Sequence, residues 1–207
     1  MATRPTVHIV DDDAAVRDSL RLLLRLHSYV SIPHASGDLF LDAVDPEQPV
    51  GIVLLDLRMP GKSGMQVQAE LAARGMPWPV ILLTAHGDAA SARTTLKAGA
   101  VDFIEKPIDD ELLLGALAQA TALAAAAEEG AARKAETDRR LARLTPREKQ
   151  VLGLVIDGRH NREVAAALGI SARTVEVYKA RLMDKLDVER LPDLIRLSVT
   201  HSLQERG

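Results

Sequence analysis

Five short runs of apolar and β-branched residues alternate with helical patterns in the first 126 residues of this 207-residue chain. This alternation constrains the fold more than any other feature. Near-continuous apolar strands that alternate with helices are typical of a parallel sheet with helices on both faces. We therefore predict a doubly wound, five-stranded α/β domain. The expected strands are Val7–Val10, Tyr29–Ile32, Ile52–Leu55, Val80–Leu83 and Val101–Ile104.

The segments between these strands have helical periodicity. The expected helices are Ala14–His27, Gly37–Val44, Gly64–Arg74, Ala89–Ala98 and a fifth from about Asp109. Residues 127–143 are rich in Ala, Glu, Arg and Lys and have few large apolar side chains. We interpret them as an exposed helical linker that follows a first domain of residues 1–126.

Residues 144–207 are predicted to form a separate, all-α domain of four helices. Thr145 and Glu148 form a capping box with Pro146 at the first helical position. The expected helices run from 146 to about 157, over Arg162–Leu168 with Asn161 as the cap, over Ala172–Leu186 with Ser171 as the cap, and onward from Pro192. The second and third are joined by a tight turn that contains Gly169, so they form a helix-turn-helix.

Composition limits the available chemistry. The chain contains no cysteine, which excludes disulfides, cysteine zinc ligands and thiol nucleophiles. Residues 1–126 carry 10 Lys or Arg against 16 Asp or Glu, whereas residues 144–207 carry 11 against 9, so the two ends suit different partners. The N-terminus lacks a signal-peptide pattern. The longest apolar run, Leu112–Ala127, is shorter than the roughly 18 residues that span a bilayer, so we expect a cytoplasmic protein with no membrane partner.

Polar residues follow four of the predicted strands. Asp11–Asp13 follow the first strand, Asp56 the third, Thr84 the fourth and Lys106 the fifth. Ligands of such sheets bind beyond the carboxyl ends of the strands. We therefore expect these side chains to converge at one edge of the sheet.

This set of groups suits phosphoryl transfer. Carboxylates that lie close together repel one another unless a cation lies between them, and Mg²⁺ prefers such oxygen ligands together with phosphate oxygens. A carboxylate is also a competent nucleophile toward phosphorus, while a Lys ammonium and a Thr hydroxyl can neutralise the transferred group. The plainer interpretation is that Asp11–Asp13 only cap the next helix, for which Asp13 is well placed. Four polar matches in order at four strand ends argue against it.

The same residues lie in motifs of a known family. Residues 1–126 resemble a response-regulator receiver domain, which implies a flavodoxin-like fold. The segments that carry the resemblance are Val10–Asp13, Asp56–Gly61, Leu83–Ala85 and Phe103–Pro107. Two further segments, Ala85–Asp88 and Lys97–Phe103, are similar to FixJ-like regulators.

The resemblance implies a role for each residue. Asp56 would accept a phosphoryl group from a histidine kinase, with Thr84 and Lys106 in contact with that group. The implied ligands of a Mg²⁺ or Mn²⁺ ion are Asp11, Asp12, Asp56 and the backbone carbonyl of Arg58. Thr84 and Phe103 would be the switch pair, because movement of the Thr84 hydroxyl vacates space for the Phe103 ring. The Lys106–Pro107 bond is expected to be cis.

The C-terminal helices resemble a LuxR-type DNA-binding domain. The segments that carry this resemblance are Leu144–Glu148, Asn161–Ala165, Ile170–Glu176 and Lys185–Leu186. The second helix of a helix-turn-helix enters the major groove. Val175, Leu182 and Leu186 mark its inward face, which leaves a polar face for bases and phosphates. The residues expected to contact DNA are Asn161, Arg173, Thr174, Glu176, Val177, Lys179, Ala180, Arg181 and Lys185.

Together the resemblances imply a transcriptional response regulator of a two-component system, not an enzyme. Phosphorylation by a sensor histidine kinase would favour a homodimer that binds double-stranded DNA, and RNA polymerase is a further candidate partner. One alternative is a phosphohydrolase that turns over through an aspartyl phosphate. Arg58 argues against it, since such phosphatases typically carry a second Asp at that position. Another alternative is a receiver whose output is protein binding only.

Overall fold

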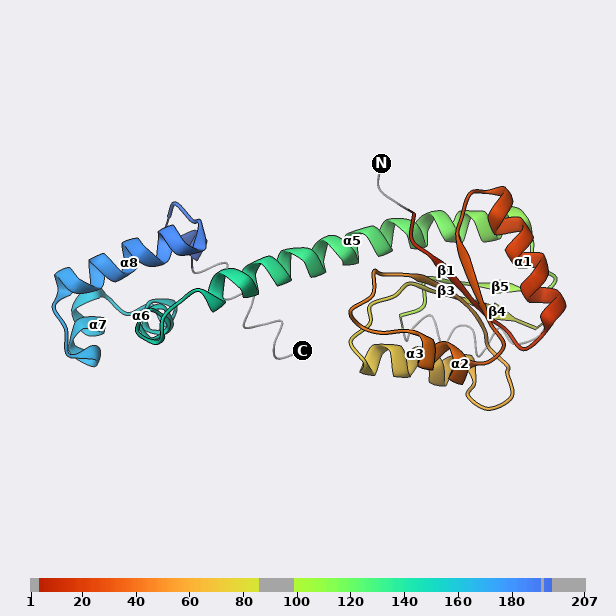
Figure 1. Cartoon of the computed structure of the whole chain (residues 1–207), viewed down its shortest axis with the longest axis horizontal. Coiled ribbons are helices and arrows are strands. Elements are labelled where there is room, and N and C mark those ends of the chain that lie inside the picture. The colour runs from red at the N-terminus through yellow and green to blue at the C-terminus, as the bar shows by residue number, and fades with distance from the viewer. Residues whose placement is uncertain (1–3, 86–98, 191, 195–207) are drawn as a thin grey trace. The chain divides into compact units, whose positions relative to one another are not determined.

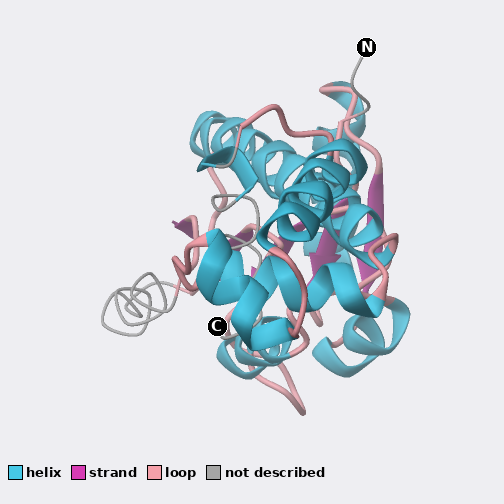
Figure 2. Ribbon diagram, turned by 90° about the vertical axis from the view of Figure 1, so that its left-hand side faces the viewer, coloured by secondary structure: helices cyan, strands magenta, loops and turns pink. Residues whose placement is uncertain are grey.

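The computed structural model describes residues 4–85, 99–190 and 192–194. The expected helix Ala89–Ala98, and all but the first turn of the helix expected from Pro192, lie outside the described residues. The chain divides into two compact units, residues 1–129 and 130–207. Among the described residues, strands occur only in the first unit. Figure 2 draws these strands in magenta and the helices in cyan.

The N-terminal unit contains a five-stranded parallel sheet. Its strands are β1 (Val7–Val10), β2 (Ser31–His34), β3 (Ile52–Asp56), β4 (Val80–Thr84) and β5 (Asp102–Glu105). The order across the sheet is β2-β1-β3-β4-β5, and every neighbouring pair is parallel. This is the flavodoxin-like strand order, which confirms the doubly wound sheet.

Strand β2 begins two residues later than predicted. The β-branched and aromatic residues Tyr29 and Val30 favoured a start at Tyr29, but the backbone N–H of Tyr29 donates to the carbonyl of Leu24 at 2.9 Å and so closes the end of the preceding helix. The ladder with β1 starts at Ser31 and includes His34, whose side chain is buried. The β propensity of Tyr29 and Val30 therefore placed the start of the strand too early, because it does not account for this turn hydrogen bond.

Helices cover both faces of this sheet. The described helices of the unit are α1 (Ala14–Leu26), α2 (Gly37–Ala43), α3 (Gly64–Ala73) and the beginning of α5 (Asp110–Ala142). Figure 1 shows α1 and the first part of α5 on one face and α2 with α3 on the other. The Asp13 side chain caps α1 by accepting from the backbone N–H of Ala15 at 2.8 Å, as predicted.

The core of the unit lies between these layers. All of β3 and β4 is buried, and Leu20 and Leu24 of α1 pack on the same cluster. Among the described residues, α5 is the one helix long and apolar enough to cross a membrane by length and composition alone. Leu113 and Leu117 of α5 are fully buried in the sheet's core, and a core helix passes the same test.

The C-terminal unit is built from helices. They are the end of α5, α6 (Pro146–Ile156), α7 (Asn161–Leu168) and α8 (Ala172–Leu186). The capping box of Thr145 and Glu148 is present as predicted. Asn161, however, is the first residue of α7 and not its cap. His160 occupies the cap position, and its backbone N–H donates to the Glu163 carboxylate at 2.7 Å. This bond from Glu163 sets the start of the helix.

Candidate functional site: an acidic pocket and a helix-turn-helix

Strand register brings the predicted polar residues to one edge of the sheet. Val10 of β1 lies beside Leu55 of β3, so the next residues along these strands, Asp11 and Asp56, are neighbours. Asp56 in turn pairs with Leu83, the residue before Thr84. The carboxyl ends of three parallel strands therefore carry the polar side chains that the sequence predicted.

Three carboxylates meet at this edge. Asp11, Asp12 and Asp56 each present an oxygen, and these oxygens lie within 4.8 Å of one another. Asp11 is completely buried and Asp56 is 6% exposed, whereas Asp12 is open to solvent. This donor set fits a hard divalent cation, which takes carboxylate oxygens and keeps part of its water shell on the exposed side.

Lys106 provides the positive charge of the pocket. Its Nζ lies 2.7 Å from Asp11 Oδ2 and 3.4 Å from Asp56 Oδ1. Burial raises the pKa of Asp56 and the charge of Asp11 adds to this, while Lys106 opposes the shift. The site therefore holds more negative charge than its own lysine neutralises.

Hydrogen bonds hold the two buried aspartates in place, at their carboxylates and at the Asp11 backbone. The backbone N–H of Asp13 donates to Asp11 Oδ1 at 2.9 Å. The guanidinium of Arg17 donates to the Asp11 carbonyl at 2.7 Å. The backbone N–H of Arg58 contributes a hydrogen bond to the Asp56 carboxylate. Sequence reasoning missed Arg17; its place one turn into the helix that follows Asp11–Asp13 was the available signal.

Thr84 and Phe103 lie on neighbouring strands. Thr84 is 1% exposed, and its hydroxyl donates to the Ala85 carbonyl at 2.9 Å. Phe103 is partly buried against the sheet's core. The backbone N–H of Lys106 donates to the Thr84 carbonyl at 2.8 Å. The Lys106–Pro107 bond is cis, as predicted.

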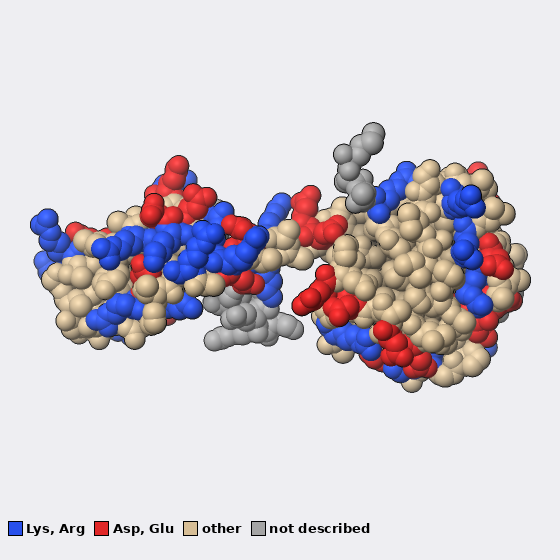
Figure 3. All heavy atoms as spheres, in the orientation of Figure 1, with Lys and Arg blue, Asp and Glu red and all other residues tan. Residues whose placement is uncertain are grey.

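A second candidate site is the helix-turn-helix of α7 and α8. Gly169 joins the helices with a left-handed backbone (φ +65°), and the Ser171 side chain caps α8. Val175, Leu182 and Leu186 are buried, which confirms the predicted inward face of α8. The residues of its outward face that are exposed are Arg173, Glu176, Val177, Ala180, Arg181 and Asp184. Figure 3 shows Lys and Arg side chains gathered in a band along one side of this unit.

Four of the residues predicted to contact DNA make side-chain bonds within this unit. The Thr174 hydroxyl lies 2.8 Å from the Ser171 hydroxyl. Lys179 Nζ donates to the Asn161 side-chain oxygen at 3.1 Å, which joins α8 to the start of α7. Lys185 Nζ lies 2.8 Å from the buried carboxylate of Glu148. Any DNA contact of Lys185 would compete with that ion pair.

Two family matches cover most of the chain. Residues 7–118 match the response regulator receiver domain, and residues 142–198 match the luxR family of bacterial regulatory proteins. The transcriptional regulatory protein FixJ of Azorhizobium caulinodans is 43% identical over 195 residues, which cover 93% of this chain and 91% of that protein. The chain is a FixJ-family response regulator. FixJ of Rhizobium meliloti is 40% identical and covers 94% of this chain and 95% of its own length.

Solved structures agree with this membership. The response regulator StyR superposes with a TM-score of 0.78 at 38% identity, and the match covers 96% of this chain and all of StyR. Full-length FixJ from B. japonicum gives a TM-score of 0.57 at 36% identity over 98% of this chain. This FixJ-family protein is therefore a two-component response regulator with a DNA-binding helix-turn-helix, and its family is one of transcriptional regulators rather than enzymes.

Proposed function

We propose that a sensor histidine kinase phosphorylates Asp56 and that this converts the regulator into a DNA-binding homodimer. In this account residues 1–126 receive the phosphoryl group, residues 127–143 are the linker and residues 144–207 bind DNA. The observation that supports it most is the convergence of Asp11, Asp12 and Asp56 on one another, with Lys106 2.7 Å from Asp11.

The Asp56 carboxylate is the nucleophile of the proposed reaction. Its oxygen attacks phosphorus, the bond from phosphorus to the kinase imidazole breaks, and the imidazole leaves. Lys106, 3.4 Å from Asp56 Oδ1, is close enough to move onto a phosphoryl oxygen. Asp11, Asp12, Asp56 and the Arg58 carbonyl would hold Mg²⁺ or Mn²⁺. Such an ion supplies charge neutralisation for the carboxylates and the phosphoryl oxygens.

Thr84 and Phe103 form the proposed switch. Thr84 follows Leu83, which pairs with Asp56 on the neighbouring strand, and its hydroxyl donates to the Ala85 carbonyl. After phosphorylation this hydroxyl would turn to a phosphoryl oxygen on Asp56. Its departure would open space for the half-buried ring of Phe103. A covalent group shifts such an equilibrium only through its different affinity for the two states, and this hydroxyl contact provides the difference.

The outward face of α8 is the proposed DNA-reading surface. Arg173 and Arg181 are exposed there and suit phosphates or guanine edges, and Val177 is 46% exposed and suits a thymine methyl. The full proposed set is Asn161, Arg173, Thr174, Glu176, Val177, Lys179, Ala180, Arg181 and Lys185. RNA polymerase is a further proposed partner, and the protein is proposed to act in the cytoplasm.

The chemistry of this proposal is tested by phosphorylation with acetyl phosphate. Wild-type protein should gain one phosphoryl group in the presence of Mg²⁺ and none in EDTA, and hydroxylamine should remove the group, as it does from an acyl phosphate. Asp56→Asn should gain none under the same conditions. Phosphorylation of both proteins to the same extent, with the label on another residue, would contradict the assignment of Asp56.

A further inference from the structure

The loop from Leu57 to Ser63 connects the phosphoacceptor strand to α3. Its first residue is tied back to the sheet, because the Leu57 N–H donates to the Leu83 carbonyl at 2.9 Å. The residue after the loop, Gly64, is bonded to the loop's first residue, since the Gly64 N–H donates to the Leu57 carbonyl at 3.1 Å. A Cβ on Gly64 would lie 2.5 Å from the Asp56 carbonyl, so only glycine permits this approach. The loop is therefore packed directly against Asp56.

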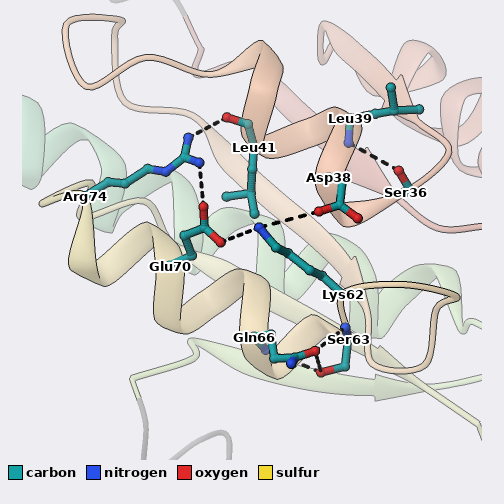
Figure 4. Close-up of polar contacts among 9 residues, drawn as sticks. All are labelled: Ser36, Asp38, Leu39, Leu41, Lys62, Ser63, Gln66, Glu70 and Arg74. Atoms are coloured by element: carbon teal, nitrogen blue, oxygen red, sulfur yellow. Dashed lines mark hydrogen bonds and ion pairs between the residues drawn. The ribbon is translucent and has the colours of Figure 1, made fainter.

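The opposite side of the loop is held by a charged network in which Lys62 is central. Lys62 Nζ lies 2.6 Å from Glu70 Oε2 of α3 and 3.5 Å from Asp38 Oδ1 of α2. Glu70 also pairs with Arg74 at 2.6 Å, and the Arg74 guanidinium donates to the Leu41 carbonyl at the end of α2. Figure 4 shows that Lys62 reaches from the loop toward both helices.

The backbone around Lys62 also lies close to the start of α2. Gly61 has a left-handed backbone (φ +79°), and a Cβ there would lie 3.1 Å from Asp38 Oδ2. The Lys62 carbonyl lies 3.3 Å from where a Cβ of Gly37 would be, at the first residue of α2. The loop thus packs against the N-terminal end of α2, and the Lys62 side chain adds an ion pair with Asp38 of that helix.

We propose that Lys62 is a positioning residue for phosphorylation: by bridging Asp38 and Glu70 it holds the Leu57–Ser63 loop in the geometry that Asp56 and the cation require. Neighbours that orient metal ligands often change metal affinity or activity 10–100-fold when they are removed. Lys62 is one step further away and its side chain is 37% exposed. We therefore expect the lower end of that range or less. The inference rests on the proposed function.

Charge and positioning predict opposite effects for Lys62→Met. Removal of a positive charge from an acidic domain should, by itself, attract Mg²⁺ more strongly. Loss of the bridge should instead loosen the loop that contains Arg58 and weaken Mg²⁺ binding. The sign of the change therefore separates the two explanations without any assumption about its size.

The test measures, in the full-length protein, the Mg²⁺ concentration that gives half-maximal phosphorylation by acetyl phosphate. Lys62→Met should raise it about fivefold, and Lys62→Arg should restore it to within about twofold because Arg can still bridge both acids. The matched control is Arg21→Met, which removes one charge from the exposed Arg21–Asp18 pair of the same domain and should leave the concentration unchanged or slightly lower. Circular dichroism checks that each variant is folded.

A second pair of variants tests the same bridge in case Lys62→Met does not fold. Glu70→Gln should raise the Mg²⁺ requirement, and Asp18→Asn, with the same charge change, should raise it less. If Lys62→Met needs the same Mg²⁺ as wild type or less, the inference about Lys62 is overturned while Asp56 phosphorylation stands. If wild-type protein is not phosphorylated, or Asp56→Asn is phosphorylated equally, the proposed function fails first.

Discussion

Asp56 is held in a pocket that disfavours its charge. Burial and the neighbouring Asp11 raise its pKa above the ordinary value of 3.8, against the effect of Lys106. A carboxyl whose pKa is raised on folding binds its proton more tightly in the folded state. Its ionisation therefore lowers stability as the pH rises above 3.8, and the loss is complete above the folded-state pKa.

The variant Asp56→Asn should accordingly be more stable than wild type at pH 7 in the absence of Mg²⁺, by on the order of 1 kcal/mol. Urea unfolding followed by the fluorescence of Trp78, the single tryptophan of the chain, measures this difference. Added Mg²⁺ should reduce it, because a cation neutralises the wild-type pocket. A less stable variant at every Mg²⁺ concentration would contradict the electrostatic description of the pocket.

Two histidines form a separate titratable contact beneath α2. His8 Nδ1 lies 3.0 Å from His34 Nε2, and the rings pack against Phe40 and Trp78. A hydrogen bond between these nitrogens requires that one of them carries a proton and the other does not, so the bond is lost when both rings are protonated. Burial and the neighbouring His34 lower the pKa of His8 to about 4, and burial lowers the pKa of His34 as well. The folded protein therefore holds both rings neutral.

This pair predicts acid sensitivity of the receiver domain. Because the folded-state pKa of His8 lies below the unfolded value of 6.5, its contribution is complete above pH 6.5 and is lost as the pH falls toward 4. At pH 5 the loss from His8 should be about 2 kcal/mol. His8→Phe keeps the ring packing but does not titrate, so its unfolding free energy should change less between pH 7 and pH 5. Equal slopes for both proteins would refute this.

At the scale of elements, the sequence predicted most helices and strands because their ends carry local signals. The Asp13 cap of α1, the capping box of α6 and the Ser171 cap of α8 are contacts between residues two or three apart in the chain. The errors at β2 and at the start of α7 arose where competing local bonds, by Tyr29 and by Glu163, decided the boundary.

Helix α6 is joined to α8 by an ion pair of Glu148, which is also the acidic residue of the capping box. Glu148 is 3% exposed and accepts from Thr145 while it contacts Lys185 at 2.8 Å, and these bonds lower its pKa to about 2. Its stabilising effect is present above pH 4.5 and is lost as the pH falls toward 2. The carboxylate thus links the start of α6 to the end of the recognition helix.

Glu148→Gln should destabilise the C-terminal unit by about 2 kcal/mol, because charge-assisted bonds are lost at a buried position. Hydrogen exchange in α6 and α8 should become faster, while exchange in β3 and β4 stays unchanged. Glu163→Gln, which alters an exposed cap of α7, serves as the matched control and should have a smaller effect. Slower or unchanged exchange in α8 of Glu148→Gln would contradict the role of this ion pair.

At the scale of the whole molecule, the sequence placed the acidic pocket correctly because parallel strands align their carboxyl ends. It did not reveal contacts between residues that are distant in the chain, such as Lys62 with Asp38, or His8 with His34. The end of α5 illustrates the same point. Arg140 donates to the Leu186 carbonyl at 3.0 Å, so the linker helix is bonded to the end of α8 within the C-terminal unit.

DNA affinity of the phosphorylated protein should depend on salt through the exposed arginines of α8. Arg173→Ala and Arg181→Ala should each lower affinity and, where the guanidinium contacts a phosphate, reduce the slope of log K against log salt by about 1. Lys134→Ala, which removes a charge from α5 instead, should leave the slope unchanged. If the slope of log K against log salt is the same in all three variants, the DNA contact does not lie on α8.

Phosphorylation of Asp56 is proposed to control DNA binding. Its most direct test compares wild type and Asp56→Asn in a DNA-binding titration on the promoter-proximal sequence of the regulator's own operon, with and without acetyl phosphate and Mg²⁺, alongside sedimentation. Wild type should bind more tightly and sediment as a dimer only after phosphorylation, and Asp56→Asn should do neither. An equal response of both proteins to acetyl phosphate would contradict the account.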